Sequence, residues 1–444
     1  MVAAQALYKS IMHFQNSLAF AQELDHKDNL SRFRHEFMIP AVDGKEQIYF
    51  LGNSLGLQPK RTPLYVMQVL DQWSHYGVDG FFKGEQPWML YHKQLIQPLS
   101  KIAGAHPTEM VVMNQLTVNL HLMLVSFYQP NETRTKILCE SKAFPSDQYM
   151  LETHIRQRGL NPDEVLIQIA APEGEHLIRE ADILDAIDRN KEELALVFIG
   201  GVNYYTGQVF DLRSITEAAH KAGAKAGFDL AHAIGNVSLH LHEWNVDFAC
   251  WCSYKYLNSG PGAVAGAFVH ERYHSNASLP RFAGWWGYKT EKRFLMQPGF
   301  EPINSAEGWQ LSTPSPVLYA THRAALEIFE EAGMNNLLQK GQQLSNYLLY
   351  LIEDINRNLG YKSISSLTPT DESRKGCQVS LLMVDNGPKV FQHLLNNGVY
   401  ADWREPNVIR VAPVPLYNTF EEVWQFARIL LETCATSSDS FSFR

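Results

Sequence analysis

The chain has 444 residues, of which 45% are hydrophobic, 11% aromatic and 19% charged, and its formal net charge is −9 at pH 7. This composition excludes a disordered or low-complexity protein and predicts a globular fold with a large core. The acidic balance and the lack of a long Lys/Arg run argue against nucleic acid as a partner, because such a surface needs clustered cations to replace the counterions of phosphates.

The N-terminal residues 1–20 mix Gln, Lys, His and Asn among apolar positions, which predicts an amphipathic helix rather than a secretory signal. No stretch reaches the roughly 18 unbroken apolar residues of a membrane span, so no membrane partner is expected. The five cysteines are odd in number and form no CxxC pair. They are typical of reduced thiols, and we expect a cytoplasmic protein.

Short apolar runs alternate with helical patterns between residues 46 and 315. The runs cover residues 110–113, 136–139, 165–169, 194–199, 225–228, 246–251 and 264–269. The helical patterns between them cover residues 117–126, 148–158, 178–188 and 212–221. Because the runs are apolar on both faces, they predict a mostly parallel sheet with helices on both sides. The expected fold class is α/β, with residues 46–315 as its large domain.

The pattern changes after the Ser- and Pro-rich stretch that ends at Pro316. Two long helical patterns, residues 318–332 and 335–357, are followed by strand-like runs at 379–384 and 408–411. Residues 316–435 are therefore predicted to form a smaller α+β domain. Residues 1–45 are expected to pack beside this domain as a helical segment, and the Ser-rich tail, residues 436–444, is expected to be frayed.

The strongest functional signal is a lysine where a buried run ends. Lys255 follows the run 246–251 through Ser253-Tyr254 and precedes a loop broken by Gly260-Pro-Gly262. The neighbouring run 225–228 ends in Asp229. In open α/β sheets, ligands bind at the carboxyl ends of strands. A lone lysine is usually a solvated surface charge, but a lysine and an acid at the ends of two nearby strands fit one cofactor.

That cofactor is pyridoxal phosphate, which needs a lysine for a Schiff base, a carboxylate for its ring nitrogen and donors for its phosphate. Thr117 opens a helical pattern, where its hydroxyl and nearby N–H groups would hold a phosphate. A plain helix N-cap explains Thr117 equally well. Phe144 would stack on the ring and Asp147 would approach its nitrogen, although the string Phe144-Pro-Ser-Asp147 is by itself only a turn.

Six strings of residues resemble those of one family. They are Phe50-Leu-Gly-Asn53-Ser-Leu-Gly, Leu116-Thr117-Val-Asn119-Leu-His, Phe144-Pro-Ser-Asp147, Phe228-Asp229-Leu-Ala-His232, Cys250-Trp-Cys-Ser-Tyr254-Lys255-Tyr-Leu-Asn-Ser-Gly-Pro-Gly and Ile409-Arg410-Val-Ala-Pro-Val-Pro-Leu-Tyr-Asn. They resemble kynureninases, which are pyridoxal-phosphate enzymes of the aspartate-aminotransferase-like fold (fold type I). Kynureninases hydrolyse L-kynurenine, or its 3-hydroxy form, to an anthranilate and L-alanine. The strings span residues 50–418 in the family's order.

The resemblance implies a role for each matching residue. Lys255 would form the Schiff base, Asp229 would pair with the pyridine nitrogen beside Asp147, and Tyr254 is the candidate proton donor. Phe144 would stack on the ring and His232 would line the pocket, while Leu116, Thr117 and Tyr254 would reach the phosphate. The substrate would contact Asn53 and, through its carboxylate, Arg410. Trp285 and Thr313 would enter from the second subunit of a homodimer.

The resemblance also implies a pathway and a substrate preference. The activity would serve tryptophan catabolism (the kynurenine pathway) or pyridine nucleotide biosynthesis. Thr313 stands where kynureninases that favour the 3-hydroxy substrate tend to carry Asn, and residues 79–84 contain no histidine. The sequence therefore predicts a preference for unsubstituted kynurenine, which a comparison of kcat/KM for the two substrates tests.

Three alternatives compete with this interpretation. A cysteine desulfurase or an aminotransferase shares the fold, and Cys377 is the one candidate for a desulfurase nucleophile. A serine hydrolase is the remote alternative, because Gly52-Asn53-Ser54-Leu55-Gly56 satisfies G-x-S-x-G. The stretch His240-Leu-His242-Glu243 lacks the helical spacing of HExxH, so no metal is expected.

Overall fold

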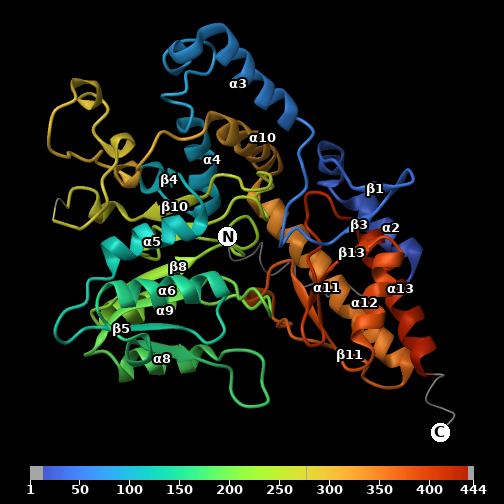
Figure 1. The fold of residues 1–444 in the computed structure, drawn as a ribbon. Helices are drawn as coiled ribbons and strands as arrows, with labels where there is room; N and C mark the ends of the chain where they lie inside the picture. Colours follow the sequence, from blue (N-terminus) through green and yellow to red (C-terminus); the bar gives the residue numbers. More distant parts are fainter. Residues whose placement is uncertain (1–13, 277, 439–444) are drawn as a thin grey trace, which may run out of the picture.

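The computed structural model describes residues 14–276 and 278–438, with a large sheet and a smaller one as its frame (Figure 1). The large sheet has seven strands in the order β4-β10-β9-β8-β7-β5-β6. Their bounds are β4 Met110–Val112, β5 Lys136–Glu140, β6 Leu166–Ile169, β7 Leu194–Gly200, β8 Lys225–Asp229, β9 Phe248–Trp251 and β10 Gly266–Val269. Strands β6, β5, β7, β8 and β9 pair in parallel, and β10 is antiparallel to β9 and β4. The predicted α/β class is confirmed.

Helices cover both faces of this sheet, as the two-sided apolar runs predicted. In β7, Val197 and Ile199 face one core cluster, whereas Leu196 and Phe198 face another. The first cluster includes residues of α4 (Lys93–Ala103), α8 (Glu180–Arg189) and α9 (Leu212–Lys221), and the second includes residues of α5 (Leu116–Phe127) and α6 (Pro145–Gln157). Such burial on both faces is what keeps a parallel sheet out of water.

The smaller sheet has four antiparallel strands in the order β11-β12-β15-β14. Their bounds are β11 Ile364–Ser366, β12 Val379–Met383, β14 Asp402–Arg404 and β15 Val408–Val411. A third core cluster joins it to α11 (Met334–Leu359), α12 (Gly387–Asn396), α13 (Phe420–Ser438) and α2 (Leu18–Lys27). The remaining elements are β1 Ala41–Val42, β2 Lys45–Glu46, β3 Ile48–Tyr49, α3 Thr62–Tyr76, α7 Pro162–Val165, α10 Pro316–Ala332 and β13 Val399–Tyr400.

The cores do not divide at the residues that the sequence suggested. Helix α10, expected at the start of the small domain, contributes Tyr319, Leu326 and Phe329 to the core of the large sheet. Phe33 and Phe37 belong to that same core, although α2 packs on α13 of the small unit. The division into domains therefore stays a proposal. Helix α13 continues to Ser438, into the tail that we expected to be frayed; residues 1–13, most of the predicted N-terminal helix, and residues 439–444 lie outside the described residues.

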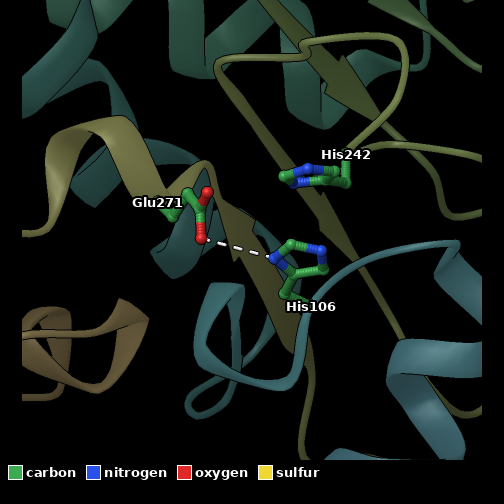
Figure 2. A group of neighbouring side chains, drawn as sticks. All are labelled: His106, His242 and Glu271. Carbon is green, nitrogen blue, oxygen red and sulfur yellow. Dashed lines mark hydrogen bonds and ion pairs between the residues drawn. The ribbon is translucent and has the colours of Figure 1, made fainter.

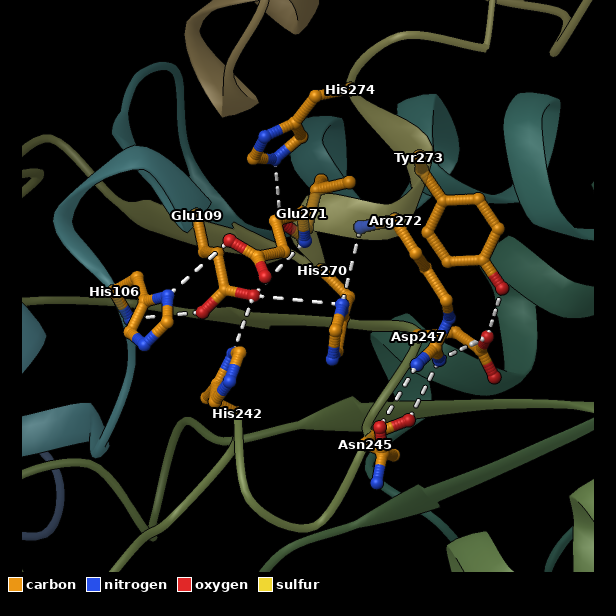
Figure 3. A network of polar contacts seen from close by, with 11 residues as sticks. His106, Glu109, His242, Asn245, Asp247, His270, Glu271, Arg272, Tyr273 and His274 are labelled. Atoms are coloured by element: carbon orange, nitrogen blue, oxygen red, sulfur yellow. Dashed lines mark hydrogen bonds and ion pairs between the residues drawn. The ribbon is translucent and has the colours of Figure 1, made fainter.

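A network of polar side chains closes the sheet edge where β4 and β9 begin and β10 ends (Figure 3). Glu109, directly before β4, accepts hydrogen bonds at Oε1 from the Glu271 backbone N–H (3.0 Å) and at Oε2 from the His106 N–H (2.9 Å), and His242 Nδ1 lies 3.0 Å from Oε1. Asp247, just before β9, pairs with His220 (2.8 Å) and Arg272 (2.7 Å). Both carboxylates are fully buried, so these partners replace their water.

The same network brings together side chains of metal-binding type that no sequence motif connects. The ligand atoms of His106, His242 and Glu271 lie within 4.8 Å of one another (Figure 2). His106 Nδ1 is 3.3 Å from Glu271 Oε2, and the rings of His106 and His242 stack at 3.8 Å between centroids. Hydrogen bonds and ring stacking account for these contacts.

Replacing Asp247 by Asn should destabilise the fold. Burial opposes ionisation of Asp247, but His220 and Arg272 outweigh it and lower the pKa of this carboxyl to about 2. Since this value is below that of an unfolded aspartate, the carboxylate stabilises the fold above about pH 4, and this contribution is lost as the pH falls toward 2. At pH 7 we expect Asp247→Asn to cost about 3 kcal/mol, because it removes a buried charge that pairs with His220 and Arg272 and places an amide that can donate among these donors.

Urea unfolding measures this loss, with Asp188→Asn as the control because that aspartate is exposed. The difference between wild type and Asp247→Asn should narrow as the pH falls from about 4 toward 2, because in this range the unfolded wild-type chain takes up a proton on Asp247 while the folded protein keeps the carboxylate ionised. A difference that stays constant over this range would contradict the assignment.

Candidate functional site

A cavity of about 340 Å³ lies at the carboxyl ends of the parallel strands. Its walls are Gln115, Leu116, Thr117, Glu140, Phe144, Ser146, Asp147, Gly200, Val202, Tyr204, Asp229, Ala231, His232, Tyr254 and Lys255. The eight residues predicted to contact the cofactor within one chain are all among them. The register explains this convergence, because β5, β7, β8 and β9 run in the same direction and end at the same edge.

Lys255 is held over the cavity by His232. Its Nζ lies 3.0 Å from His232 Nε2 and 5.8 Å from the centroid of the Phe144 ring. Burial, together with the charges of Lys255 and Arg410, holds the pKa of His232 well below its usual range. The imidazole is therefore neutral and accepts a hydrogen bond from the lysine at Nε2, while its buried Nδ1 has no hydrogen-bond partner among the described residues.

Two carboxyl groups of the cavity wall, Asp147 and Asp229, interact with the charge of Lys255 and share one proton. Burial and the neighbouring charge of Asp229 raise the pKa of Asp147 well above its usual range, and Asp147 donates a hydrogen bond to Asp229. Burial also raises the pKa of Asp229, but Lys255 and the Ala231 N–H, 2.7 Å from Oδ1, favour its ionised form. Asp229 thus carries the charge and Asp147 the proton.

The first turn of α5 forms another wall. The N-cap of α5 is Gln115, whose side chain makes no capping hydrogen bond, and Thr117 lies in the first turn. The structure therefore does not support the alternative interpretation of Thr117 as the N-cap. The backbone N–H groups of a helix N-terminus favour an anion such as phosphate. Tyr254 is half-buried beside them, and burial raises the pKa of its phenol, which stays protonated at neutral pH.

These donors fit pyridoxal phosphate. A lysine amine, an ionised carboxylate, an aromatic face and a helix N-terminus are the partners of its aldehyde, ring nitrogen, ring face and phosphate. The buried and unpartnered Nδ1 of His232 adds a polar group in the same wall. The site residues thus suit this cofactor as a set, and their individual roles stay predictions.

Arg410 and Asn53 lie behind the cavity wall. Arg410, on β15, is 2% exposed, pairs with Asp402 and donates to the carbonyl of Tyr204. Its Nε has no partner among the described residues. Asn53 donates from Nδ2 to Gln378 Oε1 at 3.0 Å, and its buried Oδ1 is unpaired within the described part of the chain. The sequence did not predict the partnership of Arg410 with Asp402.

Trp285 and Thr313 do not line this cavity. Trp285 is 44% exposed, and Thr313 is exposed in the loop before α10. One copy of the chain does not bring them to Lys255, so their expected role requires a second copy.

The residues that the competing interpretations need are poorly suited to them. Ser54 is exposed, and within residues 14–276 and 278–438 no histidine hydrogen-bonds its hydroxyl. Cys377 is buried against Asn236, and burial raises the pKa of its thiol to about 12. A thiol with this pKa is a poor nucleophile at neutral pH.

Glu140 is the charged residue among the wall residues that the sequence did not predict. It is the last residue of β5 and is 5% exposed. The available signal was a charged residue at the end of an apolar run, directly after the predicted strand 136–139.

Comparisons with known proteins agree with this geometry. Residues 337–430 match the model of the kynureninase C-terminal domain, and residues 161–370 match that of class-V aminotransferases. The chain is similar to a kynureninase of Flavobacterium psychrophilum, with 52% identity over 94% of this chain and 98% of that protein. It is also similar to a kynureninase of Nematostella vectensis, with 46% identity over 93% of each.

Solved structures with the same fold are more distant in sequence. The structure of the cystine C-S lyase C-DES superposes on this chain with a TM-score of 0.70 and 17% sequence identity. The alignment covers 86% of this chain and 97% of the C-DES chain. A cysteine desulfurase of Thermococcus onnurineus NA1 covers 88% and 95% at a TM-score of 0.71 and 15% identity. At this identity the likeness shows the fold alone.

Asp229 and Asp147 should respond differently to replacement by Asn. Since Asp229 carries the charge, Asp229→Asn removes the partner of a protonated ring nitrogen, whereas Asp147→Asn keeps a hydrogen-bond donor toward Asp229. Absorbance titration of the cofactor-free proteins with pyridoxal phosphate should show a Kd at least about tenfold higher for Asp229→Asn and a smaller change for Asp147→Asn. Equal losses, or the reverse order, would contradict the proton assignment.

Proposed function

This chain belongs to the kynureninase family, and from that premise we propose that it hydrolyses the Cβ–Cγ bond of L-kynurenine, or of 3-hydroxy-L-kynurenine, to an anthranilate and L-alanine. The observation that carries this proposal is Lys255, held between His232 and an ionised carboxylate in a cavity of fold-type-I architecture. The chain is thus an enzyme, a pyridoxal-phosphate-dependent hydrolase acting on carbon–carbon bonds in ketonic substances.

We assign each part of the cofactor to residues of the cavity wall. Lys255 would bond to the aldehyde, Asp229 would pair with the ring nitrogen, and Phe144 would cover the ring. Leu116 and Thr117, with Tyr254, would hold the phosphate at the start of α5. When bound, pyridoxal phosphate withdraws electrons from the substrate carbon that carries the amine.

The protein groups then move the protons. The amine of Lys255 would take the proton from the substrate Cα, and His232 would orient it through the 3.0 Å contact with Nζ. Asp229 would stabilise a positive charge on the ring nitrogen. Tyr254 remains protonated because of burial and is our candidate for the group that returns a proton to the product. Water adds to the γ-carbonyl before the carbon–carbon bond breaks.

Arg410 and Asn53 would bind the other end of the substrate. The free Nε of Arg410 and the free Oδ1 of Asn53 are a donor and an acceptor, which suit a carboxylate and an amino group. A guanidinium already oriented by Asp402 and the Tyr204 carbonyl loses little freedom when it binds a carboxylate.

A homodimer would complete the site. Exposed apolar residues follow one another at every third position of α3, namely Leu64, Met67, Leu70 and Trp73. Outside α3, the exposed rings of Phe82 and Trp285 both contact the exposed ring of Phe294, with 5.7 Å and 5.6 Å between centroids. A patch of this kind marks an interaction surface. In a dimer formed through this surface, Trp285 and Thr313 of one copy would reach the cavity of the other copy.

The cysteines and the helices bear on the cellular setting of the protein. All five cysteines are buried and free, which suits a reducing compartment such as the cytoplasm. None of the helices described is both long and apolar enough to cross a lipid bilayer. We place the activity in tryptophan catabolism through the kynurenine pathway, or in pyridine nucleotide biosynthesis.

Replacing Lys255 by Ala should abolish turnover. The purified protein should release fluorescent anthranilate from L-kynurenine, whereas Lys255→Ala should lose at least about a thousandfold in kcat because its base and cofactor linkage are gone. The exposed Lys191→Ala is the matched control. Anthranilate release by Lys255→Ala at the wild-type rate, or none by the wild type, would contradict the proposed function.

Mixed dimers test the sharing of sites. Trp285→Ala and Lys255→Ala should each be inactive alone, because one lacks the partner's contribution and the other the lysine. After co-refolding in equal amounts, half of the dimers are hybrids with one intact site of two, so about a quarter of wild-type activity should return. Recovery of no activity from a mixture shown to contain hybrid dimers would contradict the shared site.

A further inference from the structure

Glu140 lines the cofactor cavity and holds the turn that follows β7. Its Oε1 accepts the N–H of Gly200 at 2.8 Å, and its Oε2 accepts Nδ2 of Asn203 at 2.7 Å. The side chain is buried, so no bulk solvent replaces either contact. None of the steps above uses this carboxylate.

The side-chain oxygen of Asn203 fixes the next residues of the turn. This Oδ1 accepts three hydrogen bonds, from the Tyr205 N–H (3.0 Å), the Thr206 N–H (2.9 Å) and the Thr206 hydroxyl (3.1 Å). Because three donors fix this oxygen, the NH₂ group of Asn203 must point toward Glu140. The carboxylate of Glu140 accepts the hydrogen bond that the NH₂ group of Asn203 donates in this orientation.

Two residues of this turn, Tyr204 and Tyr205, bind the strands β12 and β15, and β15 carries Arg410. The carbonyl of Tyr204 accepts hydrogen bonds from Arg410 and from Gln378 Nε2 (3.1 Å). The carbonyl of Tyr205 accepts the hydroxyl of Ser380 at 2.6 Å, and Ser380 is paired with Arg410 in the β12–β15 register. On its other side, the Tyr204 ring meets the Phe144 ring edge-on, with 5.3 Å between centroids.

We propose that Glu140 is a positioning residue that, through Asn203 and Tyr204, sets the place of Arg410 relative to the cofactor ring and thereby the affinity for the substrate carboxylate. The proposal rests on the proposed function, since it takes Arg410 as the carboxylate ligand. It predicts a defect in binding amino acids, with little change in binding pyridoxal phosphate, because Glu140 hydrogen-bonds Gly200 and Asn203, neither of which is assigned to the cofactor.

The charge of Glu140 makes this link sensitive to pH. Burial, with the nearby charge of Asp229, raises the pKa of Glu140 to about 7, against the opposing hydrogen bonds of Asn203 and Gly200. Asp147 on α6 and the Cys139 thiol on β5 also interact with this carboxylate. A proton on Glu140 would remove one of its two acceptor oxygens, so KM should rise as the pH falls below about 7.

Glu140→Gln tests the link, because the new amide can accept the Gly200 N–H but turns an NH₂ group toward that of Asn203. The exposed Glu192→Gln is the matched control. For Glu140→Gln we expect KM for L-kynurenine and Kd for L-alanine, followed by the cofactor absorbance, to rise about tenfold. Its Kd for pyridoxal phosphate and its kcat should stay within about threefold of the wild type, and its KM should lose the rise below pH 7.

A swapped pair provides the rescue. In the double variant Glu140→Gln with Asn203→Asp, the new amide donates to the new carboxylate, so donors and acceptors again match, and most of the lost affinity for L-alanine should return. Asn203→Ala, which cuts the same link, should reproduce the selective loss if Glu140→Gln does not fold.

The proposal would be overturned by unchanged KM and alanine Kd in the folded single variants, or by a loss of pyridoxal phosphate affinity as large as the loss of alanine affinity. Failure of the swapped pair to improve on Glu140→Gln would also contradict it. Turnover of L-kynurenine by the wild type in the same assay tests the proposed function separately.

Discussion

The pairing of β8 with β9 is the constraint on which the rest of the site depends. Their parallel register sets Asp229 opposite Cys250, so the chain leaves both strands at the same edge of the sheet. Lys255 lies a few residues after β9. Its amine is 3.0 Å from His232 Nε2, and its charge interacts with that of Asp229. A buried carboxylate is costly without a positive partner, and the charge of the partly buried Lys255 offsets part of the cost of removing Asp229 from water.

The two edges of the large sheet use charge differently. At the edge where β4 and β9 begin, Glu109 and Asp247 are saturated with partners, and the pKa of each is lowered in spite of burial. At the opposite edge, Glu140, Asp147 and Asp229 share fewer donors, and burial raises the pKa of all three. At the first edge, the carboxylates are paired and stabilise the fold. At the second edge, the carboxylates have fewer partners, so they remain able to bind a cationic ring and to hold protons.

The sequence predicted the large sheet well because its strands are apolar on both faces and are separated by regular helical patterns. It also predicted eight wall residues, since each follows the end of a strand or begins a helix next to one. It did not predict what depends on contacts between distant segments. The pairing of Arg410 with Asp402, the link from Glu140 to Asn203 and the packing of α10 on the large core arise from tertiary contacts that leave no periodic pattern.

The fold alone does not distinguish the chemistries that it supports. A cysteine desulfurase shares the architecture at 15% identity, but here the one candidate nucleophile, Cys377, is buried and protonated. The function therefore rests on Lys255 and its neighbours together with membership of the family.

Covalent mapping of the cofactor tests this account most directly. The protein loaded with pyridoxal phosphate is reduced with borohydride, digested and analysed by mass spectrometry. The account predicts a phosphopyridoxyl group on Lys255, in the peptide that contains Ser253 and Tyr254. A stable adduct on another lysine, with Lys255 unmodified in protein that turns over kynurenine, would contradict it.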